Sequence, residues 1–455
     1  MAAIIEPRAT SHEPRATSHE PRATSHPSLC LGIVGLGYVG LTLAIAAADS
    51  GFKVYGTEIN PKILASLRDN HAHFHETGLD HLITEHNGKN FHSSGKFPKG
   101  TKFDAFIITV GTPLMAGTHE PNFGYIRQAV QSIREVYDGS QLVILRSTVS
   151  AGTTRNVVIP FLRDMCGKPE VFVSMCPERT VEGRAIEELT HLPQIISGNN
   201  SEALGMAEDI FTRITPSVLR AGSLEEAELA KLFCNTYRDI NFAVGNAFCL
   251  SAQTFGIDGI NVIRLANEGY SRANIAAPGF VAGPCLEKDA YILTHNMKEC
   301  PSRDFILSGR NINSSLEDAA AEWVMHKANS KVIALSGMAF KGKPETSDLR
   351  GSPSVNIARK LYAMGCELRL HDFAAYPDEM DDLGLGRACR TLREACEGAD
   401  ALMILNNHEK YSGITREDLG SEDITVLDAW QVCGKITGTF TLGNMLLPGT
   451  EGGAE

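Results

Sequence analysis

Cys285 lies in a segment whose residue types could make a thiol reactive. The segment reads Gly279-Phe-Val-Ala-Gly-Pro-Cys-Leu-Glu-Lys-Asp289, so a Gly/Pro turn precedes the thiol, and Lys288 and Asp289 follow it. If a helix begins near Cys285, these two side chains fall on the same face as the thiol. The positive helix terminus and the ammonium are then expected to lower the thiol pKa toward the nucleophilic thiolate. The alternative is a structural cysteine, since isolated cysteines are usually buried small hydrophobes.

A glycine-rich turn far upstream indicates where a cofactor would bind. The segment Leu31-Gly-Ile-Val-Gly-Leu-Gly-Tyr-Val-Gly40 is an apolar strand that runs into G-x-G-x-x-G, and a helix-like stretch follows it. In this fingerprint Gly35 permits a tight turn, Gly37 lets a pyrophosphate approach, and Gly40 allows a helix to pack on the sheet. The pattern predicts a dinucleotide-binding strand, turn and helix.

A second strand, 53–58, ends in Glu58 at the position where such folds contact a ribose hydroxyl. A carboxylate there would repel a 2′-phosphate, which favours NAD over NADP. The uncharged run 27–48 could also be a signal anchor or membrane span. Four glycines at dinucleotide spacing and the polar residues that follow favour the soluble α/β interpretation.

Composition favours a large cytosolic enzyme. The chain has 455 residues, 43% of them hydrophobic and 21% charged, which is enough for two or three domains with sizeable cores. A formal charge of -12 argues against binding to nucleic acid. The sequence has no basic amphipathic stretch, which argues against binding to a membrane surface. Eleven cysteines with no C-x-x-C pair are typical of reduced cytosolic thiols.

Two segments could distract from this interpretation. A threefold repeat of Glu-Pro-Arg-Ala-Thr-Ser-His fills residues 6–26, but it has recurring proline and no apolar heptad positions, so we expect residues 1–27 to be a disordered tail. Six histidines lie between His71 and His92. Their spacing matches no helical or finger-type ligand pattern, so we expect no metal site.

The elements that must position these residues form two α/β units. Apolar strands at 103–110, 141–145 and 171–175 alternate with helical segments, which predicts a parallel doubly wound sheet. Residues 224–255 read as one long helix, which would place Lys231 and Asn235 on one face. A second unit follows, with strands at 331–336 and 366–372 around a helix at 352–364. The predicted fold class is therefore α/β, with two Rossmann-like doubly wound parallel-sheet domains joined by a long central helix.

Seven ordered motifs between about Leu31 and Gly443 resemble those of the UDP-glucose/GDP-mannose dehydrogenase family. Besides the two segments above, they are Val110-Gly-Thr-Pro113, Ser147-Thr-Val149, Pro177-Glu-Arg179, Glu228-Leu-Ala-Lys-Leu-Phe-Cys-Asn235, and Gly337-Met-Ala-Phe-Lys341 through Asp348-Leu-Arg-Gly-Ser-Pro353. The resemblance implies a cofactor domain over 28–217, a central domain with a dimer surface over 218–318, and a UDP-binding domain over 319–445, followed by a flexible tail at 446–455. The histidine-rich segment then matches an ordinary surface stretch of that family, of the form E-x-G-L from Glu76.

The resemblance also implies an NAD-dependent oxidation of a UDP-sugar alcohol to the acid, in two hydride transfers. Cys285 would hold the aldehyde as a thiohemiacetal and then a thioester. Lys231 and Asn235 would stabilise each alkoxide, Asp289 and Thr148 are candidates to orient water, and Glu178 is the candidate to assist thioester hydrolysis, with the division between Asp289 and Glu178 left open. The implied cofactor contacts are Gly35, Gly37, Tyr38, Val39, Gly40, Glu58, Thr112, Thr148 and Lys288. The implied substrate contacts are Glu178, Arg179, Lys231, Asn235, Arg238, Arg272, Asn274, Phe280, Gly283, Phe340, Lys341 and Arg350.

For the sugar, three segments resemble the branch that acts on UDP-N-acetylhexosamines of the mannosamine or glucosamine type, for surface polysaccharide. They are Cys176-Pro-Glu-Arg-Thr-Val-Glu-Gly183, Asn235-Thr-Tyr-Arg-Asp-Ile-Asn241 and Tyr270-Ser-Arg-Ala-Asn274. UDP-glucose is the alternative substrate. The chain departs from the family pattern at Ala282, where glycine is usual, at Thr77, where proline is usual, and at Glu58, where Asp is commoner. None of these changes removes a reacting group.

Overall fold

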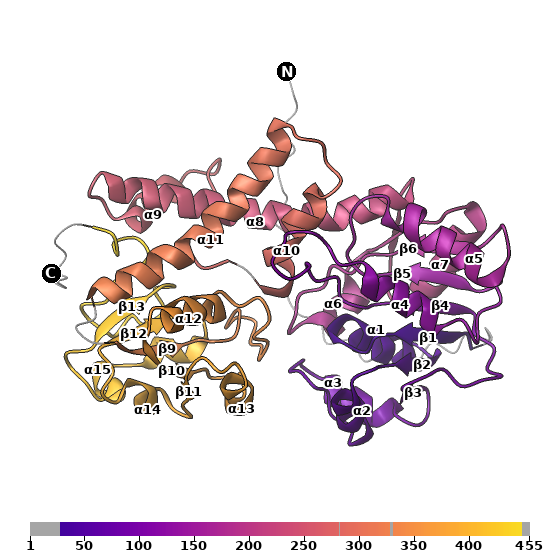
Figure 1. Ribbon diagram of the computed structural model, residues 1–455, viewed down its shortest axis with the longest axis horizontal. Coiled ribbons are helices and arrows are strands. Elements are labelled where there is room, and N and C mark those ends of the chain that lie inside the picture. The colour runs from indigo at the N-terminus through magenta and orange to yellow at the C-terminus, as the bar shows by residue number, and fades with distance from the viewer. Residues whose placement is uncertain (1–27, 282, 328–330, 448–455) are drawn as a thin grey trace.

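The computed structural model describes residues 28–281, 283–327 and 331–447, and it arranges them as two α/β domains joined by a long helix (Figure 1). The repeat at 6–26 and the tail beyond 447 lie outside these residues. The uncharged run near the start is divided between strand β1 (Cys30–Val34) and helix α1 (Tyr38–Asp49). Among the described ranges, no helix combines the length and the apolar character needed to cross a membrane.

The first domain is built on a six-stranded parallel sheet with the order β3-β2-β1-β4-β5-β6. This is the strand order of the dinucleotide-binding fold. After β1 the strands are β2 (Lys53–Thr57), β3 (Phe91–Ser94), β4 (Ala105–Ile108), β5 (Leu142–Leu145) and β6 (Phe172–Met175). After α1 the helical segments are α2 (Pro61–Arg68), α3 (Leu79–His86), α4 (Gly124–Ser132), η1 (Thr154–Val158), α5 (Ile159–Cys166), α6 (Ala185–His191) and α7 (Ser201–Phe211).

The composition of β1 and α1 explains why they form the centre of this domain. All five residues of β1 are buried, as expected for a parallel strand covered on both faces. The helix α1 is rich in alanine and buries every residue from Gly40 to Ala48. Such small side chains let the helix lie close to the sheet, which fixes the turn between them.

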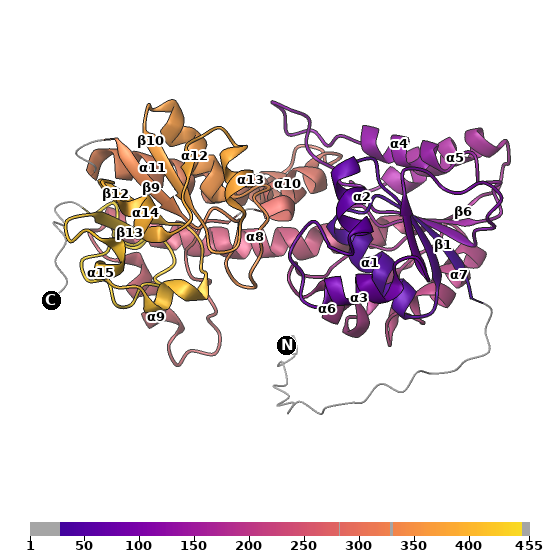
Figure 2. The same ribbon diagram turned by 90° about the horizontal axis from the view of Figure 1, so that it is seen from below.

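A two-stranded parallel ribbon, β7 (Gln194–Ile196) and β8 (Val218–Arg220), leads to the long helix α8 (Leu224–Thr254). The side chain of Ser223 caps α8 by accepting a hydrogen bond from the Glu226 N–H. With 31 residues the helix is about 46 Å long. Figure 2 shows that α8 spans both domains, and the helices α10 (Gly283–Thr294) and α11 (Pro301–Lys327) pack against it.

The second domain is a five-stranded parallel sheet with the order β11-β10-β9-β12-β13. Its strands are β9 (Val332–Ser336), β10 (Glu367–His371), β11 (Arg387–Ala388), β12 (Ala401–Ile404) and β13 (Thr425–Asp428). The remaining helical segments are α9 (Gly259–Asn267), α12 (Pro353–Ala363), α13 (Pro377–Asp381), α14 (Leu392–Cys396), η2 (Glu409–Gly413) and α15 (Arg416–Leu419). The predicted fold class is confirmed.

Candidate active site

Helix α10, which carries Cys285, lies between the two domains (Figures 1 and 2). Gly283 begins this helix with φ +90°, and its N–H donates a 2.6 Å hydrogen bond to the carbonyl of Gly351 in the second domain. A Cβ at Gly283 would lie 2.6 Å from a ring carbon of Phe340. The first turn of α10 is therefore packed closely against the loop that carries Phe340.

Asp289 is the centre of a hydrogen-bonded group that joins α10 to α8. Its Oδ1 accepts from Lys288 Nζ at 2.7 Å, and its Oδ2 accepts from Asn235 Nδ2 at 2.6 Å. Asp289 is almost fully buried. Desolvation disfavours the charged form of Lys288, but the Asp289 carboxylate outweighs it and raises the pKa of Lys288. The predicted helical register is confirmed, because Cys285, Lys288 and Asp289 all lie on α10 at spacings of three and four residues.

The predicted pKa of Cys285 is wrong in direction. Cys285 keeps an exposed surface, yet desolvation by the surrounding protein and the Asp289 carboxylate raise the pKa of its thiol. Lys231 and Lys288 act in the opposite sense and do not prevail. The main physical reason is desolvation, which disfavours the charged thiolate. In addition, Lys288 forms an ion pair with Asp289, so an anion accompanies the cation that was expected to favour the thiolate.

Lys231 occupies the same face of α8 as Asn235 and is also buried. Within the part of the chain that the structure describes, its ammonium forms no hydrogen bond or ion pair. It is close enough to Cys285 and to Glu178 to favour the charged form of each. A buried cation near a thiol and a carboxylate can stabilise an oxyanion that develops close to it.

Glu178 follows β6 and is held by a buried arginine that sequence reasoning missed. The guanidinium of Arg146 pairs with Oε2 of Glu178, while the N–H groups of Arg179 and Thr180 donate to Oε1 at 2.6 and 2.8 Å. Desolvation opposes ionisation, but Arg146, the Thr180 N–H and Lys231 together lower the pKa of Glu178. Arg146 directly precedes the Ser147-Thr-Val149 motif, which was the available signal.

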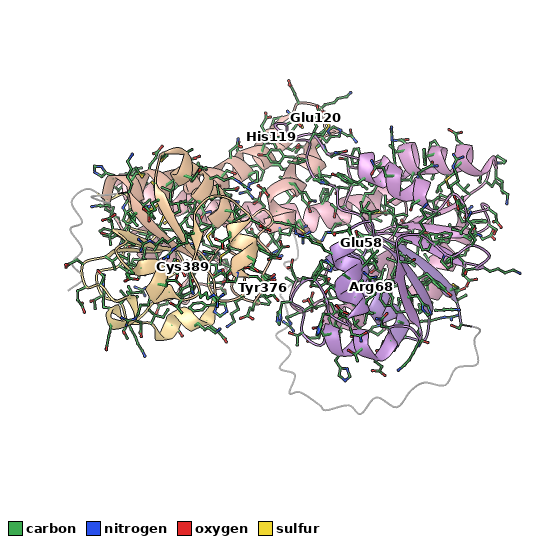
Figure 3. The ribbon with its side chains drawn as sticks, turned by 60° about the horizontal axis from the view of Figure 1, so that its bottom comes forward. Glu58, Arg68, His119, Glu120, Tyr376 and Cys389 are labelled. Atoms are coloured by element: carbon green, nitrogen blue, oxygen red, sulfur yellow. The ribbon has the colours of Figure 1, made fainter. Side chains whose placement is uncertain are left out.

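The glycine turn fits a dinucleotide. A Cβ at Gly40 would lie 1.8 Å from the carbonyl oxygen of Gly35, whereas a Cβ at Gly37 would meet nothing within 4 Å. Gly40 therefore allows the close packing of α1 against the turn, and Gly37 leaves open space where a pyrophosphate could approach. Glu58 is labelled in Figure 3. Its Oε2 accepts a 2.9 Å hydrogen bond from the N–H of Leu36, a residue of the turn. These residues would hold the pyrophosphate and ribose of NAD.

Four other predicted cofactor residues lie around this turn. Tyr38 and Val39 supply the first residues of α1, but the hydroxyl of Tyr38 is bonded to the carboxylate of Glu76. Glu76 is buried and also accepts a 2.8 Å hydrogen bond from the Gly183 N–H, so this E-x-G-L segment is not an ordinary surface stretch as expected. Thr112 and Thr148 follow β4 and β5 and are joined by a 2.6 Å hydrogen bond from Thr112 Oγ1 to the Thr148 carbonyl.

The loop between β9 and α12 carries the cations predicted for a diphosphate. Lys341 Nζ donates to the carbonyl of Glu182 at 2.6 Å and lies 5.2 Å from the centroid of the Phe340 ring. Desolvation lowers the pKa of Lys341. The guanidinium of Arg350 forms a forked pair with Asp348, with contacts of 2.6 to 3.0 Å. Both cations therefore already have protein partners that an anionic ligand would have to displace.

The structure does not bring every predicted substrate residue into this group. Arg238 is exposed on α8 and lies near enough to Lys341 to affect its pKa. The side chain of Phe280 is buried in the core of the second domain. Arg272 and Asn274 lie on an exposed loop after α9, where the Arg272 guanidinium stacks on Tyr270 at 4.9 Å.

The guanidinium of Arg179 is bonded to the carbonyl of Pro193. His71 pairs with Asp80 and His86 with Asp49, and burial lowers the pKa of His73. Within the described residues, no three His, Cys, Asp or Glu side chains come together in a way that could hold a metal ion.

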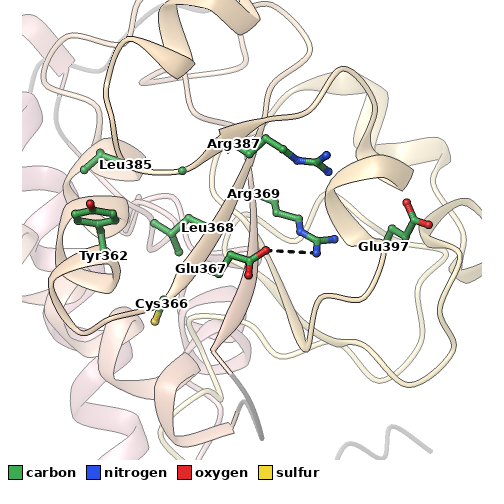
Figure 4. A pocket seen from close by; sticks show the side chains of 9 residues that line it. Tyr362, Cys366, Glu367, Leu368, Arg369, Leu385, Arg387 and Glu397 are labelled. Atoms are coloured by element: carbon green, nitrogen blue, oxygen red, sulfur yellow. Dashed lines mark ion pairs between the residues drawn. The ribbon is translucent and has the colours of Figure 1, made fainter.

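A pocket of about 700 Å³ lies elsewhere, at the start of β10 (Figure 4). Arg369 on β10 and Arg387 on β11 are opposite each other in the strand register. Nη2 of Arg369 lies 3.6 Å from Oε1 of Glu367, with which it forms an ion pair. The nine lining residues are Tyr362, Cys366, Glu367, Leu368, Arg369, Leu385, Gly386, Arg387 and Glu397. None of them belongs to the group around Cys285.

Three family models match successive parts of the chain. Residues 30–215 match the NAD binding domain of the UDP-glucose/GDP-mannose dehydrogenase family, 225–315 match its central domain, and 334–435 match its UDP binding domain. A protein named UDP-N-acetyl-D-mannosamine dehydrogenase from Pyrococcus horikoshii is 32% identical over 409 residues, covering 86% of this chain and 92% of the relative. A protein of the same name from Campylobacter jejuni is 31% identical, covering 83% and 95%.

A solved structure of a UDP-D-ManNAc dehydrogenase from Pyrococcus horikoshii has a TM-score of 0.81 with this chain at 29% identity, and it is covered completely. The fold, the glycine turn and these matches define an NAD-dependent oxidoreductase with a separate domain for a UDP-sugar. The chain belongs to the UDP-glucose/GDP-mannose dehydrogenase family. The predicted family, enzyme class and cofactor are thus confirmed.

Proposed function

We propose that this chain oxidises the C6 hydroxyl of a UDP-N-acetyl-hexosamine, of the mannosamine or glucosamine type, to the uronate for surface polysaccharide. The observation that carries the proposal is the convergence of Cys285, Lys288 and Asp289 on α10 with Lys231 and Asn235 on α8. The relatives named UDP-N-acetyl-D-mannosamine dehydrogenase support the sugar class. UDP-glucose is the alternative substrate.

The reaction needs two hydride transfers with the aldehyde retained between them. The glycine turn of Gly35, Gly37 and Gly40 would hold NAD, which would supply the hydride acceptor for each oxidation. In the first oxidation the hydroxyl group loses its proton and the C6 carbon loses a hydride, which leaves an aldehyde. Lys231 and Asn235 stabilise the alkoxide that forms as the proton leaves. Asp289, bonded to Lys288 and Asn235, is the neighbouring carboxylate through which the proton can depart.

Cys285 then keeps the aldehyde on the enzyme. A bond forms between its sulfur and C6, and the thiol proton goes to the carbonyl oxygen, which gives a thiohemiacetal. The raised pKa of Cys285 is compatible with this step, because addition of a neutral thiol carries its own proton. Loss of a second hydride and the hydroxyl proton from C6 leaves a thioester.

Water completes the reaction by adding to C6: a C6–oxygen bond forms and the bond between C6 and sulfur breaks. One proton of the water goes to the sulfur and the other is released to solvent. Glu178 is held ionised by Arg146, so its carboxylate orients the water and stabilises its developing positive charge. Thr148 is a second candidate for orienting this water. The products are the carboxylate and the free Cys285 thiol, so the thiol is ready for another cycle.

The test is the number of NADH molecules formed per sugar consumed. UDP-N-acetylmannosamine, UDP-N-acetylglucosamine, UDP-N-acetylgalactosamine and UDP-glucose are compared with the wild type, with Cys285→Ser and with the control Cys166→Ser at the end of α5. Two NADH per sugar, lost in Cys285→Ser and kept in the control, is the expected result. One NADH per sugar, or full turnover without the thiol, would contradict the covalent route.

We further propose that the enzyme is a homodimer, or a higher homo-oligomer, in which two copies pair through α8. Four large apolar side chains on this helix are 38–68% exposed and are spaced by four, seven and four residues: Phe233, Tyr237, Val244 and Phe248. This spacing places them in one stripe along the helix. A second copy related by a two-fold axis can cover the stripe with its own, because such an interface is self-complementary.

A further inference from the structure

Arg310 on α11 holds the backbone on both sides of Cys285 without touching the thiol. Its Nη2 donates to the carbonyl of Val281 at 2.7 Å, and its Nη1 donates to the carbonyl of Leu286 at 3.3 Å. The same Nη1 donates to Oδ1 of Asp239 on α8 at 2.6 Å. Arg310 is 2% exposed, so these contacts are shielded from water. One planar guanidinium therefore ties the thiol's segment to α8.

Two buried asparagines extend this attachment. The side-chain amide of Asn246 on α8 accepts from the Gly279 N–H at 2.9 Å and donates to the Gly279 carbonyl at 3.0 Å. It also donates to Asn313 on α11 at 2.8 Å, and Asn313 donates in turn to Oδ1 of Asp239 at 2.9 Å. The network thus fixes the segment before Cys285 at Gly279 and Val281.

The same face of α8 carries the residues that act on the substrate in the proposed reaction. Lys231, Asn235 and Asp239 are spaced by four residues, so they follow one another along that face. Asn235 donates a hydrogen bond to Asp289 on the thiol's helix, Lys231 is near enough to Cys285 to favour its thiolate, and Asp239 accepts a hydrogen bond from Arg310. The distance between the thiol and its oxyanion donors is consequently set by one buried network.

Stability alone does not explain this network. Nε of Arg310 and Oδ2 of Asp239 are buried without a hydrogen-bond partner, and each such atom costs free energy of folding. Desolvation also raises the pKa of Asp239 despite the adjacent guanidinium. Apolar residues of similar volume often stabilise a core as well as a buried ion pair does. The fork geometry toward two carbonyls is what an apolar side chain could not supply.

We propose that Arg310 is a positioning residue that sets the location of the Cys285 thiol relative to Lys231 and Asn235. The proposal deepens the proposed function and rests on it for its kinetic readout. When the fork is lost, the segment around Cys285 shifts and the thiol no longer meets C6 in the required geometry. A displacement of about 1 Å can lower a rate by about 100-fold.

The experiment compares the wild-type enzyme with Arg310→Lys, which keeps a positive charge for Asp239 but lacks the planar fork. The first readout needs neither cofactor nor sugar: the rate at which iodoacetamide alkylates Cys285 across pH 6–10, followed by mass spectrometry of the Cys285 peptide. The second is kcat and KM for NADH formation. We expect a displaced pH profile of alkylation and a kcat lowered by about 10-fold to 100-fold, with KM for NAD unchanged.

The matched control is Glu317→Gln, on the same helix but directed toward Lys360 of α12. Burial raises the pKa of Glu317 to about 7, so this control also removes an acid that titrates in the measured range. It should keep the alkylation profile and kcat of the wild type. If Arg310→Lys does not fold, Asn246→Ala, which removes the bonds to Gly279, is expected to displace the same profile.

Alkylation and kcat at wild-type values in a folded Arg310→Lys or Asn246→Ala enzyme would overturn the proposal. The same holds if Glu317→Gln produces an equal change, because the effect would then be a general response of α11. A displaced alkylation profile in an enzyme that oxidises no UDP-sugar would leave Arg310 as the positioning residue and would refute the proposed function instead.

Discussion

The hydroxyl of Thr346 in the second domain donates a 2.6 Å hydrogen bond to Oε1 of Glu182 in the first. The carbonyl of the same Glu182 accepts from Lys341, and a Cβ at the following Gly183 would lie 3.0 Å from Pro344. Glu182 therefore lies where the cofactor domain meets the loop that carries the predicted diphosphate ligands. Its carboxylate links the two domains across the site.

The burial of Glu182 makes stability depend on pH. Desolvation and the nearby Asp348 raise the pKa of Glu182 from 4.5 to about 6. The folded protein then binds a proton more tightly than the unfolded chain, so the free energy of unfolding falls as pH rises from 4.5 to 6 and is constant above. The loss is about 2 kcal/mol. Thermal unfolding between pH 4.5 and 8 should show this slope, and Glu182→Gln should reduce it.

Thr346→Val is the matched variant for this contact. It keeps the side-chain volume and removes the donor that favours the Glu182 carboxylate, so the slope should extend to higher pH. Identical pH profiles for the wild type, Glu182→Gln and Thr346→Val would show that this pair does not control stability.

The two glycines of the cofactor turn should respond differently to alanine. In Gly37→Ala the new Cβ meets no protein atom, so the fold should keep its melting temperature while NAD binding weakens by at least about 10-fold, because the methyl group occupies the approach of the pyrophosphate. In Gly40→Ala the Cβ overlaps the Gly35 carbonyl, and overpacking should cost about 1–3 kcal/mol or more. Calorimetric titration with NAD and thermal unfolding separate the two effects. Equal loss of stability in both variants would contradict the assignment.

Arg146 should be essential for the buried charge of Glu178. Arg146→Met leaves that carboxylate without its cation, which should cost about 3–5 kcal/mol of stability. The remaining carboxylate should also have a raised pKa, so the acid limb of the activity profile should move to higher pH. Urea unfolding followed by circular dichroism measures the first effect.

A double variant controls for the loss of the arginine side chain itself. Arg146→Met with Glu178→Leu removes both charges and should recover most of the stability, although not the activity. If the double variant is no more stable than Arg146→Met alone, the penalty comes from packing around Arg146 and not from an unpaired charge.

The exposed stripe on α8 should control the oligomeric state. Phe233→Glu with Phe248→Glu places charges in the proposed two-fold interface, so sedimentation equilibrium should shift from dimer to monomer. Leu265→Glu on α9, an exposed apolar residue outside the stripe, is the control and should leave the dimer intact. A wild-type monomer, or a dimer in the double variant, would contradict this interface.

The amino-acid sequence by itself determined the elements and their local chemistry. The helix predicted over 224–255 is observed as Leu224–Thr254, and the strand predicted over 366–372 is observed as Glu367–His371. The sequence also predicted the G-x-G-x-x-G turn, the acid after β2 and the helical spacing of Cys285, Lys288 and Asp289. These features depend on backbone sterics and helical period, which involve residues that are neighbours in the chain.

The tertiary structure alone decided which polar and charged side chains contact one another. Asn235 and Asp289 are 54 positions apart, Arg146 and Glu178 are 32 apart, and Arg310 and Asp239 are 71 apart. No local pattern specifies such partners, so the buried Arg146 and Arg310 were missed and the pKa of Cys285 was predicted in the wrong direction. Desolvation and ion pairing depend on which segments face each other, and only the packing of α8, α10 and α11 between the two domains determines that.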